Sequence, residues 1–146
     1  MNEKNYNAEL LNFIYQNSQM GVDTITQLLE IAQDGDFKDH LHAQLKEYRQ
    51  IHDKAAQMLE ANGFTEEGLT AFEKIRTYLM INFQTLSDDS TSHIAEMLMV
   101  GSNMGVIDAI KNIRKYKDVA EADILELMEH LKKFEENNVE RFKPYL

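Results

Sequence analysis

Hydrophobic residues recur at intervals of three and four along most of the chain, which is the spacing of one face of an α-helix. This period covers residues 8–34, 37–61 and 66–86, and it returns in two further segments within residues 90–143. No stretch alternates apolar and polar residues in the way a half-buried strand does. The pattern therefore predicts an all-α protein of five helices in a single domain, residues 1–146.

Turn residues divide the helices into two pairs. Asp34-Gly35-Asp36 combines a helix-ending glycine with an aspartate that can cap the next helix, and Asn62-Gly63 supplies the next stop. Residues 118–121 (Asp-Val-Ala-Glu) have the spacing of a reciprocal helix cap. Because only a few residues link the helices of each pair, we expect two antiparallel hairpins, residues 5–62 and 90–143.

A five-residue phrase occurs twice, as Ser18–Val22 and as Ser102–Val106, at a spacing of 84 positions between residues 18 and 102. The same offset aligns hydrophobic positions of the two hairpins: Leu10 with Ile94, Phe13 with Met97, Ile14 with Leu98 and Leu29 with Ile113. Such an internal repeat indicates two related structural units. We therefore expect residues 66–86 to form a crossover helix between two repeated hairpins.

Each copy of the phrase places a glycine inside a helix, Gly21 in the first and Gly105 in the second. An interior glycine costs about 0.5 to 1 kcal/mol relative to alanine, so the matching pair needs an explanation. With Ser18 and Ser102, the glycines form a notch of small residues on the first and fourth helices. One interpretation is that the two notches meet and let the backbones approach closely. The other is that they leave space for a ligand or metal.

The expected crossover helix is apolar on more than one side. One face carries Phe72, Ile75, Leu79, Phe83 and Leu86, and a second carries Tyr78, Met80 and Ile81. A helix that is apolar nearly all round is buried on more than one side. It either lies across the bundle as an internal connection or forms a homodimer contact with its outer face.

Two repeated hairpins joined by a long crossover resemble the ferritin-like four-helix bundles. In particular, residues 10–14 (Leu-Leu-Asn-Phe-Ile) and the acidic turn at residues 33–36 are similar to the opening hairpin of short uncharacterised bacterial ferritin-like proteins. The resemblance spans most of the chain. It implies a ferritin-like four-helix bundle with a fifth, crossover helix.

The metal-binding members of that superfamily hold two metal ions with a glutamate on each of two helices and a Glu-x-x-His pair on each of the other two. No glutamate in this chain has histidine three positions later. We therefore expect no di-iron centre and no cofactor. The residues that could contribute to an atypical iron, manganese or zinc site are Glu47, His52, His93, Glu96 and Glu135.

Tyr48 and His52 lie one turn apart on the hydrophobic seam of the second helix. Buried polar groups need partners, and Asn17, Glu135 and Asn138 fall near core positions of other helices. These side chains form either a hydrogen-bonded core cluster or part of a ligand pocket. The residues expected around such a pocket are Ser18, Gly21, Tyr48, His52, Ser102 and Gly105.

Composition narrows the possible functions further. The net charge of −10 at pH 7 would repel a nucleic-acid backbone, so we expect no nucleic-acid partner. The absence of cysteine fits a cytoplasmic protein. Apolar stretches fall short of the roughly 20 residues of a membrane span, so we expect no membrane partner. Phosphate-binding loops and hydrolase motifs are also missing.

The sequence therefore favours a non-catalytic binding or structural module over an enzyme, and we expect it to be a homodimer through residues 66–86. The alternative is a metal-binding protein or metal-dependent oxidoreductase that uses atypical carboxylate and histidine ligands.

Overall fold

A computed structural model of the chain describes residues 3–64 and 90–146. They form four α-helices, and a short 3-10 helix, η2, follows the last of them. The bounds are Glu3–Leu29 for α1, Gly35–Ala61 for α2, Thr91–Tyr116 for α4, Ala122–Phe142 for α5 and Lys143–Tyr145 for η2. The described residues contain no strand, so the all-α prediction is confirmed for them. The expected crossover helix at residues 66–86, with its expected dimer contact, lies outside the described residues.

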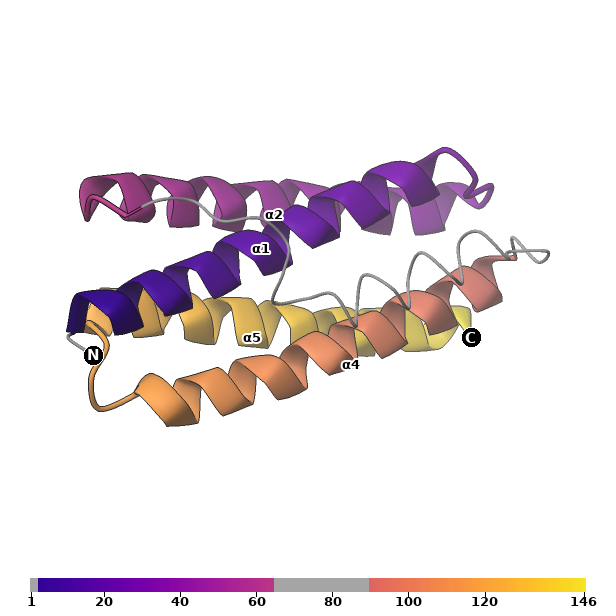
Figure 1. Cartoon of the computed structure of the whole chain (residues 1–146). Helices are drawn as coiled ribbons and strands as arrows, with labels where there is room; N and C mark the ends of the chain where they lie inside the picture. Colours follow the sequence, from indigo (N-terminus) through magenta and orange to yellow (C-terminus); the bar gives the residue numbers. More distant parts are fainter. Residues whose placement is uncertain (1–2, 65–89) are drawn as a thin grey trace.

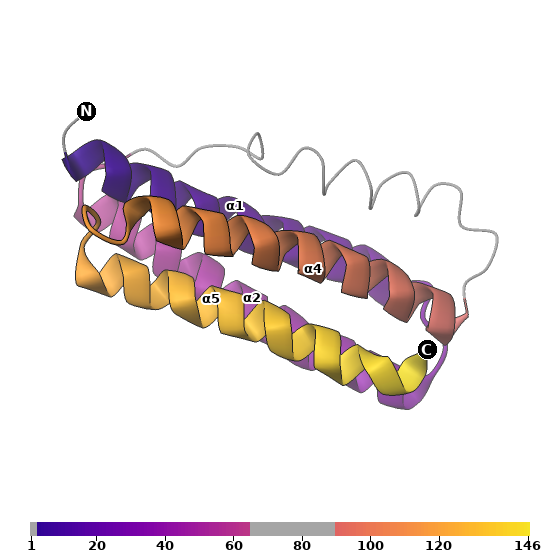
Figure 2. The ribbon, with the colours of Figure 1, turned by 90° about the horizontal axis from the view of Figure 1, so that it is seen from below.

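The four helices pack as a bundle of two antiparallel hairpins. α1 packs against α2 and α4 packs against α5 (Figure 1). Seen from below, α1 also lies beside α4, and α2 lies beside α5 (Figure 2). α2 ends and α4 begins at opposite ends of the bundle, so α1 and α5 run in one direction and α2 and α4 in the other (Figure 1).

The core lies along the bundle axis and is made mainly of long aliphatic and aromatic side chains. Its largest fully buried members are Phe37, Phe142, Leu10, Leu11, Ile14, Ile25, Leu28, Leu41, Leu59 and Ile94. Burying one such side chain contributes about 1.5 to 3 kcal/mol, and the helical spacing of these positions places them on inward faces. Of the helices in the described ranges, none combines the length and apolarity needed to cross a membrane.

Local capping groups set three of the helix ends. The Asp34 side chain accepts a hydrogen bond of 2.8 Å from the backbone N–H of Phe37, so Asp34 caps α2 and α1 ends before it. Gly63, with a φ of 73°, lies just after the end of α2 in a conformation that favours glycine. The Ser90 hydroxyl accepts a hydrogen bond of 3.2 Å from the N–H of His93 and so caps α4.

The predicted reciprocal cap at residues 118–121 is wrong. Glu121 occupies the N-cap position of α5 without a side-chain cap, and its own backbone N–H donates to Oδ1 of Asn7 on α1 at 2.9 Å. The side chain of Asn7, from the other hairpin, therefore takes the place of a local cap at the start of α5. Nearby, the hydroxyl of Tyr116 at the end of α4 donates to Oε2 of Glu9, also on α1. The link between α4 and α5 is therefore held by α1.

Ser90→Ala is expected to lower the free energy of unfolding by about 1 kcal/mol, because the N–H of His93 loses its acceptor. Ser92→Ala is the matched control, since Ser92 is exposed in the same turn, and its expected effect is below about 0.5 kcal/mol. Urea denaturation of both variants measures the difference. Equal losses in the two variants would contradict a capping role for Ser90.

Candidate functional site: a polar layer across the bundle core

A layer of polar side chains crosses the mainly hydrophobic core. Each member is at most 8% exposed, and all four described helices contribute. We call this set the polar layer; its members are Asn17 and Ser18 from α1, Gln44 and Tyr48 from α2, Ser102 from α4, and Glu135 and Asn138 from α5. Burying so many polar groups together is unfavourable unless they find hydrogen-bond partners, so their arrangement decides what the layer can do.

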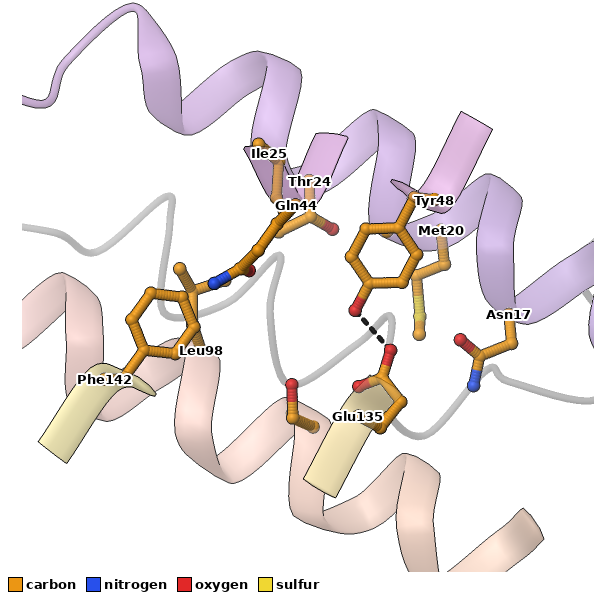
Figure 3. A pocket seen from close by; sticks show the side chains of 12 residues that line it. Asn17, Met20, Thr24, Ile25, Gln44, Tyr48, Leu98, Glu135 and Phe142 are labelled. Atoms are coloured by element: carbon orange, nitrogen blue, oxygen red, sulfur yellow. Dashed lines mark hydrogen bonds between the residues drawn. The ribbon is translucent and has the colours of Figure 1, made fainter. Parts of the chain in front are cut away.

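Tyr48 and Glu135 form the central contact of the polar layer. The Tyr48 hydroxyl donates a hydrogen bond to Oε1 of Glu135 across the space between α2 and α5 (Figure 3). The ring of Phe134 packs edge-on against Tyr48, with 4.8 Å between the ring centroids, and holds the tyrosine in place. Two distant segments of the chain are thus joined by a buried, charge-bearing contact.

Burial changes the acid–base behaviour of this pair. Loss of water raises the pKa of the Glu135 carboxyl from 4.5 to about 7, against the opposing effect of hydrogen bonds from Tyr48 and Ser102. Burial, together with the neighbouring charge of Glu135, raises the pKa of the Tyr48 hydroxyl well above its usual range. Tyr48 therefore remains a donor at neutral pH, whereas Glu135 gains and loses its proton there.

The two repeated glycines make room for other side chains. A Cβ atom on Gly21 would lie 2.5 Å from Cδ1 of Tyr48, so the glycine accommodates the tyrosine ring. A Cβ atom on Gly105 would lie 3.3 Å from Nδ2 of Asn17 and 3.8 Å from Oε2 of Glu135. The Cβ contacts favour the second interpretation, because side chains lie nearest to both glycines and Gly21 and Ser102 line one cavity. Each notch receives side chains from other helices, and the offset of the repeat does not reveal which helix supplies them.

A cavity of about 30 Å³ adjoins the Tyr48–Glu135 contact. This is room for two or three water-sized groups, since one water needs roughly 10 to 15 Å³ of such space. The lining combines part of the polar layer with an apolar wall, and its residues are Asn17, Met20, Gly21, Thr24, Ile25, Gln44, Tyr48, Leu98, Gly101, Ser102, Glu135 and Phe142. Figure 3 shows Gln44 extending toward Leu98 and Phe142 on one side, with Tyr48 and Glu135 on the other.

Several polar atoms at this level have no partner among the described residues. Nε2 of Gln44 is buried without an acceptor, and Asn138, which is 0% exposed, has neither of its amide atoms paired. An unpaired buried polar group costs about 1 to 3 kcal/mol. The polar layer therefore has hydrogen-bonding capacity that the described chain leaves unused.

The expected pocket residues divide into two groups. Gly21, Tyr48 and Ser102 line the cavity, and Gly105 lies against Glu135. Ser18 is buried, but its hydroxyl donates back to the carbonyl oxygen of Ile14 at 2.8 Å, within its own helix. His52 is not among the lining residues, because its ring stacks on Tyr15 with 4.4 Å between centroids.

The structure does not bring the candidate metal ligands together into one site. Oε1 of Glu47 lies 3.3 Å from Nε2 of His130, a surface pair between α2 and α5. His93 lies in the first turn of α4 and Glu96 is exposed further along the same helix, while Glu135 lies in the core. Within residues 3–64 and 90–146, no group of three or more histidine and carboxylate side chains could hold a metal ion. These residues do not fit the ligand set of a di-metal centre.

Gln44 is the functional candidate that sequence reasoning missed. It interrupts a seam of apolar residues, and it lies four residues before Tyr48, which places both on one face of α2. A glutamine at a core position beside a buried tyrosine was the available signal.

Comparison of the chain with protein-family models, curated proteins and solved structures gives no match in any of the three. The geometry of the polar layer is therefore the basis for a function.

Proposed function

We propose that this protein is a non-catalytic binding module whose ligand site is the cavity beside the polar layer. The observation that carries the proposal is a cavity whose wall combines the buried amide of Gln44, with its nitrogen unpaired, and the buried Glu135 carboxyl. A bundle selected for stability alone would gain from apolar side chains at these positions, since unpaired buried polar groups are unfavourable. A ligand that forms hydrogen bonds with these groups removes this unfavourable contribution, which favours binding.

The proposal includes a ferritin-like layout and an internal repeat. In its support, α2 ends and α4 begins at opposite ends of the bundle, which requires a connection along its length (Figure 1). Residues aligned by the repeat offset also have matching burial: Leu10 and Ile94 are each 0% exposed, and Phe13 and Met97 are both buried. A duplicated hairpin accounts for both observations.

The binding site is tested by a nuclear magnetic resonance screen of the full chain with small polar compounds of about one to three heavy atoms, the size that the cavity admits. We expect at least one compound to shift the amide resonances of cavity-lining residues saturably, including Gly101 and the side-chain amide of Gln44. Shifts confined to the surface groove between α2 and α5, around Ile51 and Leu127, would contradict the proposal. So would a screen in which no compound shifts any resonance.

Self-association through residues 66–86 is part of the same proposal. It is supported by the two apolar faces that the sequence gives this segment. Light scattering is expected to report twice the chain mass of 17.0 kDa. A monomer at high concentration would contradict the dimer without affecting the binding site.

Metal binding is a second candidate function, and one contact favours it. Glu47 and His130 lie 3.3 Å apart on facing helices and could provide two ligands to a divalent ion. Elemental analysis of protein purified without added metal decides between the two functions. Stoichiometric iron, manganese or zinc that Glu47→Gln removes and Glu60→Gln retains would replace the binding-module proposal.

A further inference from the structure

Glu135 is a buried carboxylate without a matching positive charge. Its hydrogen-bond partners are the hydroxyl groups of Tyr48 and Ser102, and no lysine, arginine or histidine of the described ranges forms an ion pair with it. An ionised carboxylate in such surroundings is strongly unfavourable unless a proton or a cation neutralises it. Burial raises the pKa of Glu135 to about 7, although its hydrogen bonds with Tyr48 and Ser102 oppose this shift. At or above neutral pH, the site therefore attracts a cation.

The cavity next to Glu135 is lined by further hydrogen-bond acceptors. Ser102 and Tyr48 contribute hydroxyl oxygens, and Asn17 contributes an amide. Gln44 adds a second amide: in the orientation described its Nε2 is an unpaired donor, and turning the amide over exchanges this donor for an oxygen that can accept a hydrogen bond. Donors on a ligand would find acceptors from three or more helices around them.

Charge and size exclude most cations. A calcium-like divalent ion takes six to eight oxygen ligands, commonly from several carboxylates, and only one carboxylate lines this cavity. The volume of about 30 Å³ admits two or three heavy atoms and no hydration shell. Two classes remain, a dehydrated alkali cation and a compact cation of single charge that carries its own hydrogen-bond donors, and the other side of the cavity distinguishes them.

The opposite side of the cavity is apolar. Leu98 and Phe142 lie on this side, next to the amide of Gln44 (Figure 3), and Ile25 and Met20 add further apolar lining. These carbon atoms cannot replace the water around a strongly hydrated ion, but they can pack against a methyl group. An ammonium group with at most one or two carbon atoms satisfies both sides at once. Its N–H groups face the acceptors and any carbon atom faces the wall.

We infer that the cavity binds a small ammonium cation, either ammonium itself or a short primary alkylammonium, with Glu135 as its counter-charge. The N–H groups donate to the Glu135 carboxylate, to Ser102 and to the amide oxygens of Asn17 and Gln44. Tyr48 positions the carboxylate through its own hydrogen bond to Oε1. This inference rests on the proposed function and specifies the ligand class of the same site.

The test is a titration of the full chain at pH 8 with ammonium chloride and methylammonium chloride, each replacing sodium chloride at constant ionic strength. The readout is the amide resonances of Gly101, Ser102 and Gln44. We expect saturable shifts, and we expect Glu135→Gln to weaken binding at least about tenfold, because the glutamine keeps the shape and removes the charge. Glu136→Gln is the matched control, since Glu136 is exposed, and its affinity should equal that of the wild type.

Each other outcome has a definite meaning. The inference would be overturned if Glu135→Gln and the wild type bound ammonium with equal affinity. It would also be overturned if the potassium ion bound as tightly as ammonium. If neutral compounds such as methanol bind in the cavity while ammonium cations do not, the inference fails and the proposed function stands. If nothing binds, both fail. Should Glu135→Gln not fold, Ser102→Ala serves instead, with an expected loss of about threefold or more from one missing acceptor.

Discussion

Wild-type protein is expected to lose about 3 kcal/mol of unfolding free energy between pH 4.5 and pH 7 through Glu135 alone, and Glu135→Gln is expected to abolish this loss. The carboxyl has a pKa of about 7 in the folded chain against 4.5 for its ordinary value. Below pH 4.5 it is protonated in both states, so the contribution is fully present. As the pH rises toward 7, the carboxyl of the unfolded chain loses its proton while the folded chain keeps it, so the free energy of unfolding falls. Above pH 7 the carboxyl becomes ionised in both states, and the free energy of unfolding levels off.

The measurement is urea denaturation of the wild type and of Glu135→Gln at half-unit steps from pH 4.5 to pH 8. Subtracting the two curves removes the effects of the other carboxylates and of the net charge of −10. Glu136→Gln, the exposed neighbour, should give a curve parallel to that of the wild type. A difference between wild type and Glu135→Gln that stays constant with pH would show that Glu135 does not hold its proton in the folded chain.

Gly21→Ala is expected to destabilise the protein by about 1 to 3 kcal/mol, although alanine is the better helix former. The added Cβ would lie 2.5 Å from the ring of Tyr48. That ring cannot move freely, because its hydroxyl is bonded to Glu135 and its face contacts Phe134. Thermal and urea denaturation measure the loss.

Two comparisons isolate the contact between Gly21 and Tyr48. Gly105→Ala is the equivalent change in the other copy of the repeat, and its nearest contact of 3.3 Å is to a side-chain amide that can shift, so a near-neutral result is expected. In a Tyr48→Ala background the clash is gone, and Gly21→Ala should stabilise by up to about 1 kcal/mol through helix propensity. Additive effects of the two substitutions would contradict the steric explanation.

The helices were predictable where their signals are local. Asp34 and the Asn62-Gly63 pair mark ends of α2 as expected, because a cap or a left-handed glycine acts on residues a few positions away. The cap at residues 118–121 was mispredicted because Asn7, from the far end of the chain, accepts the N–H of Glu121. A long-range partner of this kind leaves no trace in the local pattern.

The site was predictable only in part, for a related reason. Helical spacing identifies Tyr48 and Glu135 as core positions, and their chemistry then makes them candidates. Spacing cannot say which side chain lies against a given glycine, so the contact between Tyr48 and Gly21 was not predicted, and His52 was placed in a pocket although it stacks on Tyr15. Which side chains contact Gly21 and His52 depends on the rotation of each helix about its axis. That rotation is determined by the packing of all four helices together.

Because every described helix contributes to the polar layer, its members cannot change one at a time without loss. Replacing Glu135 by an apolar residue leaves the Tyr48 hydroxyl without its acceptor, so the first replacement is costly and a second, at Tyr48, recovers part of that cost. Divergent descendants of this chain should therefore exchange these positions as a set. In such lineages, covariation among the positions of the polar layer would indicate that the layer has been retained.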